Sequence, residues 1–195
     1  YRQYERALAE YIWPRDLVVG GSTLEELTFI VSRDYWGLKR SRGETDDDLA
    51  RRKAEAKLDY EKRIVEILQQ QEVDLIISDS YMTIFQHILQ FYPDRILNMH
   101  PAITRPGDIA RLPGATPTRD AYTRATHGYV IVDDKTVVDM PDGDEVLVQF
   151  QDRTRTARMV GQNFSHGVTV HQVTEDVDRG PVILERKYDL RGLFG

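Results

Sequence analysis

The sequence contains no cysteine among its 195 residues. Disulfide bonds, thiolate metal ligands and a cysteine nucleophile are therefore excluded. No apolar run approaches the ~20 residues that a membrane-spanning helix needs, and no basic segment followed by an apolar one indicates an export signal. We therefore expect a cytoplasmic protein with no membrane partner.

Basic residues are too few for a general nucleic-acid partner. The chain carries 26 Lys and Arg against 32 Asp and Glu, a formal net charge of −6 at pH 7. Binding to nucleic acid rests on neutralising phosphates, so an acidic chain argues against that partner. The composition, with 41% hydrophobic and 30% charged residues, is otherwise that of a globular protein. The length predicts a single domain over 1–195.

The sequence also lacks the patterns of three kinds of site, namely a serine nucleophile, a phosphate loop and a metal centre. Ser78, Ser80 and Ser165 lack the flanking glycines of a nucleophile elbow, so a serine hydrolase is not predicted. No Gly-rich phosphate loop is present, and Gly20-Gly21-Ser22-Thr23 is the nearest approach to one. The acidic triplet at 46–48 is interpreted as favourable charge at a helix start rather than as a metal site.

Hydrophobic patterning predicts an α/β fold. Apolar runs at 73–78 and 95–99 flank an amphipathic stretch at 83–91, which indicates two buried parallel strands joined by a helix. The other expected elements are a strand at 27–31, a helix from Asp46 with Ala50, Ala54, Leu58, Val65 and Leu68 on its apolar face, a helix from Thr116 to about Ala125 that Gly128 stops, and strands at 167–173 and 182–184.

Residues 129–150 differ in character from the rest. Runs of β-forming residues alternate there with Asp-Asp and Asp-Gly turn signals, as in antiparallel hairpins. We therefore expect an antiparallel β insertion that spans about 127–166. Its strands either cover a substrate or pair by their edges with a second copy in a homodimer.

Two groups of polar residues are candidates for chemistry. Asn98 and His100 stand two apart at the end of a strand, so both side chains project to one side of the sheet. An amide beside an imidazole suits oxyanion stabilisation or proton transfer, although a histidine in such a place is more often structural. The segment 174–181 is either a solvated acidic turn or the source of one carboxylate that holds and charges the histidine.

The other histidines receive less specific predictions. His171 lies in the strand before the acidic segment, and we favour a supporting role for it. His87, His127 and His166 are predicted to be surface or capping residues.

Together these segments resemble the folate-dependent formyltransferases, and most closely the glycinamide ribonucleotide formyltransferases. The resemblance rests on four ordered motifs, Ser78–Phe85, Ile96–Pro101, Leu112–Ala121 and Gly167–Leu184. It implies a Rossmann-like formyltransferase fold, with a mostly parallel sheet flanked by helices. It also implies 10-formyltetrahydrofolate as the formyl donor, a primary amine as the acceptor and no metal.

The resemblance carries residue roles onto this chain. It assigns catalysis to Asn98, His100 and Asp178, with His171 beside them. It matches Lys57 to the family's basic residue that contacts the phosphate of the acceptor. The residues that it places against the folate are Met82, Thr83, Ile84, Phe85, Thr174, Glu175 and Asp176.

The chain departs from the family pattern mainly on the acceptor side. We expect the family's N-terminal strand with its Gly-rich loop, and its closing C-terminal helices, to be absent from 1–195. Extra residues also follow His100-Pro101. The acceptor is therefore either glycinamide ribonucleotide, which would mean a role in purine biosynthesis, or another small amine.

Two other functions stay open. One is hydrolysis of the same donor, against which Pro101 argues because the hydrolases of this kind often carry a second histidine at that position. The other is a non-catalytic folate-binding module.

Overall fold

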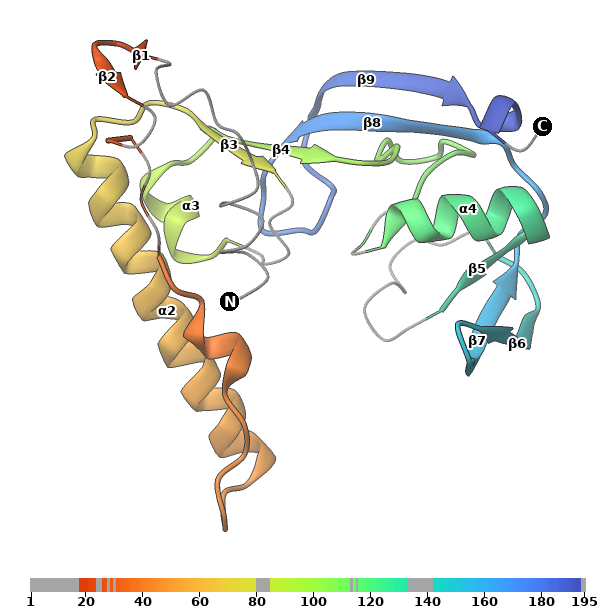
Figure 1. The fold of residues 1–195 in the computed structure, drawn as a ribbon, viewed down its shortest axis with the longest axis horizontal. Coiled ribbons are helices and arrows are strands. Elements are labelled where there is room, and N and C mark those ends of the chain that lie inside the picture. Colours follow the sequence, from red (N-terminus) through yellow and green to blue (C-terminus); the bar gives the residue numbers. More distant parts are fainter. Residues whose placement is uncertain are drawn as a thin grey trace. The chain divides into compact units, whose positions relative to one another are not determined.

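The computed structural model describes residues 18–23, 26–27, 29, 31–79, 85–112, 114, 116–132 and 142–193 (Figure 1). The chain divides into two compact units, Tyr1–Ile67 and Leu68–Gly195. The described elements of the first unit are β1 (Val18–Val19), β2 (Ser22–Thr23), a 3-10 turn at Asp34–Gly37 and most of α2 (Asp46–Gln70).

The first unit opens with a two-residue hairpin. β1 and β2 pair antiparallel, and Gly20 and Gly21 between them have φ angles of 60° and 90°. Positive φ at both central positions is what the tight hairpin turn of type I′ requires. The glycine pair that most nearly resembled a phosphate loop is thus a chain reversal. The strand predicted at 27–31 is wrong for its described residues, because Leu27 lies in a turn and Phe29 is outside any strand.

Helix α2 begins where its acidic triplet predicted. The Thr45 hydroxyl accepts a hydrogen bond from the Asp48 backbone N–H (3.1 Å), and the Asp48 carboxylate accepts one from the Thr45 N–H (3.3 Å). This reciprocal pair caps the first turn. The apolar face predicted for the helix is partly wrong: Ala50, Ala54 and Leu58 are exposed, whereas Val65 is buried as predicted, together with Tyr60 and Glu61. Tyr60 packs against Tyr35 of the 3-10 turn, with ring centroids 5.6 Å apart.

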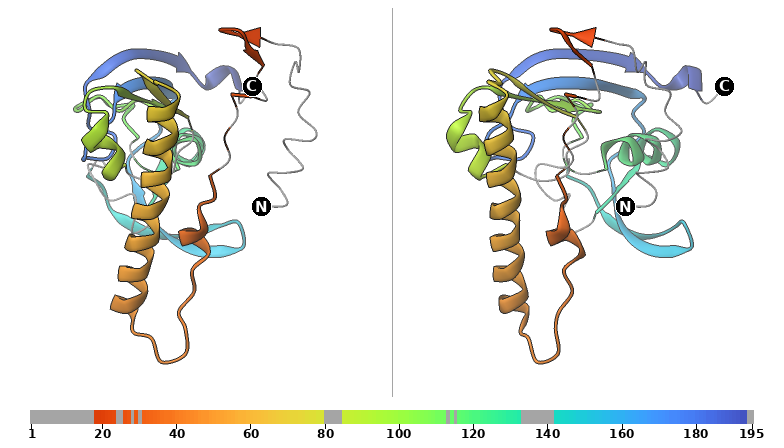
Figure 2. Two further views of the ribbon diagram at one scale, coloured as in Figure 1. Left: turned by 90° about the vertical axis from the view of Figure 1, so that its left-hand side faces the viewer. Right: turned by 60° about the vertical axis from the view of Figure 1, so that its left-hand side comes forward.

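The second unit contains a four-stranded sheet in the order β3-β4-β8-β9. β3 and β4 are parallel and are joined through α3, which confirms the predicted strand–helix–strand unit. β4 pairs antiparallel with β8, and β8 pairs antiparallel with β9, so the sheet is mixed (Figure 2). The bounds are β3 (Ile76–Asp79), α3 (His87–Phe91), β4 (Ile96–His100), β8 (Ser165–Gln172) and β9 (Val182–Asp189).

β3 is not the buried strand that its composition suggested. Ile77 is 62% exposed, and only Ser78 of this strand is buried. Among the described strands, β3 pairs with β4 alone and stands at an edge of its sheet. An apolar run indicates that a segment can be buried. It does not indicate whether other elements of the fold cover that segment.

A second, antiparallel sheet confirms the expected β insertion. Its strand order is β5-β7-β6, formed by β5 (Tyr129–Ile131), β7 (Arg153–Met159) and β6 (Glu145–Phe150). The middle strand, β7, was not predicted, because its sequence alternates arginine and threonine and contains few apolar residues. It is a strand because both neighbours supply backbone partners along it.

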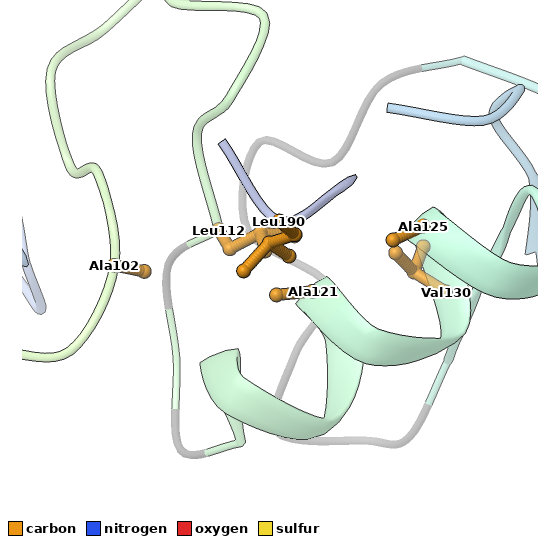
Figure 3. Packing of buried hydrophobic residues seen from close by; sticks show 6 residues of the cluster. All are labelled: Ala102, Leu112, Ala121, Ala125, Val130 and Leu190. Carbon is orange, nitrogen blue, oxygen red and sulfur yellow. The ribbon is translucent and has the colours of Figure 1, made fainter. Parts of the chain in front are cut away.

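Helix α4 (Pro117–His127) joins the two sheets of the second unit. It starts with proline at its first position and ends at Gly128, whose φ of 75° is the left-handed conformation that glycine permits. Figure 1 shows the helix between the β8–β9 pair and β5. The core that it covers is formed by Ala102, Leu112, Ala121, Ala125, Val130 and Leu190 (Figure 3). No helix within the described part of the chain is long and apolar enough to span a bilayer.

Gly167 offers a test of how tightly β8 is packed. A methyl group at this position would overlap the backbone oxygen of Arg186 and the side chain of Ile103. We expect Gly167→Ala to lower the free energy of unfolding by about 1–3 kcal/mol, the usual range for overpacking. Gly192→Ala is the control, because its added methyl meets nothing within 4 Å. Urea denaturation measures both; equal stabilities would contradict the close approach.

Candidate functional site

The site begins with two adjacent strands that bring distant histidines together. In the β4–β8 register, Asn98 lies opposite His171 and His100 lies opposite Thr169. Alternate residues of a strand share a face, so Asn98 and His100 project to the same side. The Asn98 amide nitrogen lies 3.2 Å from His171 Nε2. The sequence prediction that these residues share one side of the sheet is therefore consistent with the observed register.

Asp178 reaches both histidines from the loop between β8 and β9. Its Oδ1 lies 3.5 Å from His100 Nδ1 and 3.5 Å from His171 Nε2. Its Oδ2 accepts a hydrogen bond of 2.9 Å from the backbone N–H of Gly114. The side chains of all three residues are less than a tenth exposed. One of the three acids in the 174–181 segment thus turns inward, while Glu175 and Asp176 are exposed.

His100 has a defined ring orientation. Its Nε2 lies 3.0 Å from the carbonyl oxygen of Leu112. A carbonyl can only accept a hydrogen bond, so Nε2 must carry the proton in this contact. Nδ1 then faces the Asp178 carboxylate, which accepts hydrogen bonds and so favours a proton on Nδ1. A ring with a proton on each nitrogen satisfies both neighbours at once.

His171 is oriented differently. Its Nδ1 lies 2.9 Å from the backbone oxygen of Gln172 and therefore donates to it. Its Nε2 faces two groups, the Asn98 amide nitrogen at 3.2 Å and Asp178 Oδ1 at 3.5 Å. His171 therefore lies between the amide and the carboxylate of the site.

The Asp178 carboxyl is held in its charged form. Burial raises its pKa, but this effect is outweighed by the hydrogen bond to His171, the charge of His100 and the hydrogen bond from Gly114. The net result is a pKa below the ordinary value for aspartate. The site therefore keeps a negative charge next to His100 at neutral pH.

The residues predicted on the folate side are only partly described. Met82, Thr83 and Ile84 lie outside the described residues. Phe85 is buried. The Thr174 hydroxyl donates to the backbone oxygen of Asp176 (3.1 Å), which shapes the loop that carries Asp178.

Lys57, the residue matched to a phosphate contact, belongs to α2 in the first unit. Its ammonium group lies 3.3 Å from the carboxylate of Glu61, one helical turn further on.

Sequence reasoning missed the backbone groups of the site and misplaced one histidine. The Leu112 carbonyl and the Gly114 N–H carry no signal in residue type. His166, predicted to be a surface or capping residue, is instead 4% exposed and packs edge-to-face against Tyr188. That prediction is wrong because the polar sequence around His166 lies within β8, under the packed loop after β4. Among the residues that the structure describes, no group of three or more side chains is arranged to hold a metal ion.

Comparison with known proteins identifies one family that matches this chain. A family model described as formyl transferase matches residues 30–149, which is more than half of the chain. PvdF of pyoverdin biosynthesis, an N10-formyltetrahydrofolate-dependent formyltransferase, superposes with a TM-score of 0.63 at 24% identity over 92% of this chain. That match covers 57% of PvdF, so this chain spans little more than half the length of its structural relative. No curated protein matches the chain.

Two further solved structures are more weakly similar to this chain. Glycinamide ribonucleotide transformylase 1 from Symbiobacterium toebii is 27% identical, with a TM-score of 0.43, over 67% of this chain and 42% of that protein. Phosphoribosylglycinamide formyltransferase from Streptococcus pneumoniae TIGR4 is 25% identical, with a TM-score of 0.44, over 74% of this chain and 66% of that protein.

The burial of His166 predicts that folding depends on pH. Burial, with the charges of Arg124 and His100 adding to it, lowers the pKa of His166 from 6.5 to about 4. Between these values the unfolded chain takes up a proton that the folded protein does not, so the free energy of unfolding falls as the pH falls from 6.5 to 4. We expect His166→Gln to flatten this dependence by up to about 3 kcal/mol.

Urea denaturation at several pH values between 4 and 7.5 measures the slope. His127→Gln, which changes an exposed histidine at the end of α4, is the control. A His166→Gln slope equal to that of the wild type would show that His166 does not cause the dependence.

Proposed function

Because this chain belongs to the formyl transferase family, we propose that it transfers a formyl group from 10-formyltetrahydrofolate to a primary amine. This proposal rests on the cluster of Asn98, His100 and Asp178, with His171 beside it, in which the side chains of His100, Asp178 and His171 are buried. These residues come from two strands and a loop that are far apart in the sequence. The amide, imidazole and carboxylate are the groups that a transfer between nitrogen atoms needs.

The proposed reaction is attack of the amine nitrogen on the formyl carbon. The new nitrogen–carbon bond forms, the bond from the formyl carbon to N10 of the folate breaks, and one proton passes from the amine to N10. The formyl oxygen becomes an oxyanion on the way. Groups that donate hydrogen bonds to this oxygen stabilise the transition state more than the ground state.

We assign the oxyanion contacts to the Asn98 amide and to Nδ1–H of His100. Nε2 of His100 is anchored on the Leu112 carbonyl at 3.0 Å, whereas Nδ1 is 3.5 Å from Asp178, which is long for a hydrogen bond. The Nδ1 proton is therefore the one that is available to donate to a reacting atom. Asp178 keeps the ring correctly turned, and it accepts the amine proton directly or through water and passes it on toward N10.

The donor side of the site follows the family resemblance. We propose that the segment 82–85 and the loop at 174–176 contact the folate, and that Lys57 contacts a phosphate on the acceptor. The acceptor is either glycinamide ribonucleotide or another small amine.

Replacing His100 is the sharpest test of the proposed chemistry. We expect His100→Ala to lower kcat by about 100- to 1000-fold, the usual cost of removing one oxyanion donor, while the Kd for the folate stays within about twofold. His127→Ala, which removes an exposed histidine, serves as the control with unchanged kcat. The assay follows formyl transfer from 10-formyltetrahydrofolate to a panel of amines that includes glycinamide ribonucleotide.

The same assay separates the proposal from its alternatives. Formate release with no formylated amine would indicate a hydrolase. Folate binding without turnover on any acceptor would indicate a binding module. Full turnover by His100→Ala would overturn the assignment of His100.

A further inference from the structure

The loop that follows β4 closes on itself before it reaches the site. Ile103 and Arg111 form a parallel bridge, and the Leu112 N–H donates a hydrogen bond of 3.0 Å to the Ile103 carbonyl. The two ends of the loop are buried, whereas Arg105 to Gly107 at its tip are exposed. We call residues 103–112 the return loop.

The end of the return loop supplies backbone contacts to both partners of the His100–Asp178 pair. The Leu112 carbonyl accepts from His100 Nε2, and two residues later the Gly114 N–H donates to Asp178 Oδ2. One short stretch of main chain therefore holds His100 at Nε2, the nitrogen that does not face Asp178. It also holds Asp178 at Oδ2, the oxygen that does not face the histidines. Any shift of this stretch moves both side chains together.

Arg111 is placed to prevent such a shift. It immediately precedes Leu112, and its side chain is buried. Its Nε donates a hydrogen bond of 2.9 Å to the Thr104 carbonyl, across the neck where the two ends of the loop meet. A guanidinium group is planar and presents its donors in a fixed fork, whereas an ammonium group swivels on a flexible stem. Arg111 thus ties the two ends of the return loop rigidly.

A second buried arginine supports the same loop from α4. Arg124 donates hydrogen bonds to the carbonyls of Ile109 (3.1 Å), Ala110 (3.4 Å) and Ser165 (2.9 Å). It therefore joins the return loop to the start of β8. These contacts hold the loop as a whole, while Arg111 acts next to the Leu112 carbonyl itself.

We propose that Arg111 is a positioning residue for His100. By closing the neck of the return loop, it aims the Leu112 carbonyl at Nε2 and so turns Nδ1 of His100 toward Asp178 and the formyl oxygen. This proposal rests on the proposed function of the same site. Arg111 itself makes no contact with the substrates in this account, and its effect passes through Leu112.

The expected result of loosening the neck is a loss of rate with little loss of binding. Without a fixed acceptor at Nε2, the ring would take more than one orientation, and misplacement of a reacting group by about 1 Å costs on the order of 100-fold in rate. The proposed effect of Arg111 passes through Leu112 and His100 rather than through the folate-contacting segments. The KM for the donor should therefore change much less than kcat.

The experiment compares Arg111→Lys with Arg105→Lys in the full chain. Arg105 lies in the same loop but is exposed, and it pairs with Glu185 on β9. We expect Arg111→Lys to lower kcat by about 10- to 100-fold with the donor KM within about twofold, and Arg105→Lys to change neither. Nitrogen-15 NMR of histidine-labelled protein, with the His100 signals assigned from His100→Gln, should show one sharp, hydrogen-bonded Nε2–H signal in the wild type and a weakened or broadened one in Arg111→Lys.

The NMR readout keeps this proposal separate from the proposed function. If the wild type transfers no formyl group, the function is wrong, but a changed His100 signal in Arg111→Lys would still support the positioning role. A wild-type kcat together with an unchanged His100 signal in Arg111→Lys would overturn it. If Arg111→Lys does not fold, Arg124→Lys loosens the same loop from α4; an unchanged His100 signal in that variant would also overturn the proposal.

Discussion

The structure of the site depends on a single carboxylate that serves two histidines. Asp178 Oδ1 is equidistant from His100 and His171, which belong to neighbouring strands with opposite directions. A buried carboxylate without such partners would be costly, and buried imidazoles without it would have unmet nitrogen atoms. Each of the three groups therefore offsets the free-energy cost of burying the other two. Their mutual distances follow from the register of β4 and β8.

The surrounding elements each contribute a restraint on this cluster. The mixed sheet sets the spacing of the histidines, and the loop after β8 supplies the carboxylate. The return loop supplies the Leu112 carbonyl, Gly114 just beyond it supplies an N–H, and buried arginines hold the loop. All of these restraints are contacts within the chain itself. The cluster is consequently ordered before any substrate arrives, which is the condition under which hydrogen-bond donors contribute most to catalysis.

The sequence was informative where one residue type or one spacing has a single physical meaning. The i, i+2 spacing of Asn98 and His100 predicted a shared face, Gly128 predicted the end of α4, and four motifs identified the family. It was uninformative where the deciding group is backbone, as at Leu112, or where neighbours decide burial, as at His166 and Ile77. The strand β7 escaped notice because arginine and threonine alternate in it, and pairing on both sides rather than hydrophobicity makes it a strand. The catalytic roles themselves stay predictions.

Asp178 has a φ of 53°, in the left-handed region. Aspartate and asparagine tolerate this region better than most residues other than glycine, and a longer acidic side chain does so less readily. The choice of acid at this point is thus constrained twice, by the reach needed to meet two rings and by the fold of its own main chain. An engineer who wished to retune the cluster would find asparagine an admissible neutral substitute there, whereas glutamate would disturb the turn as well as the charge.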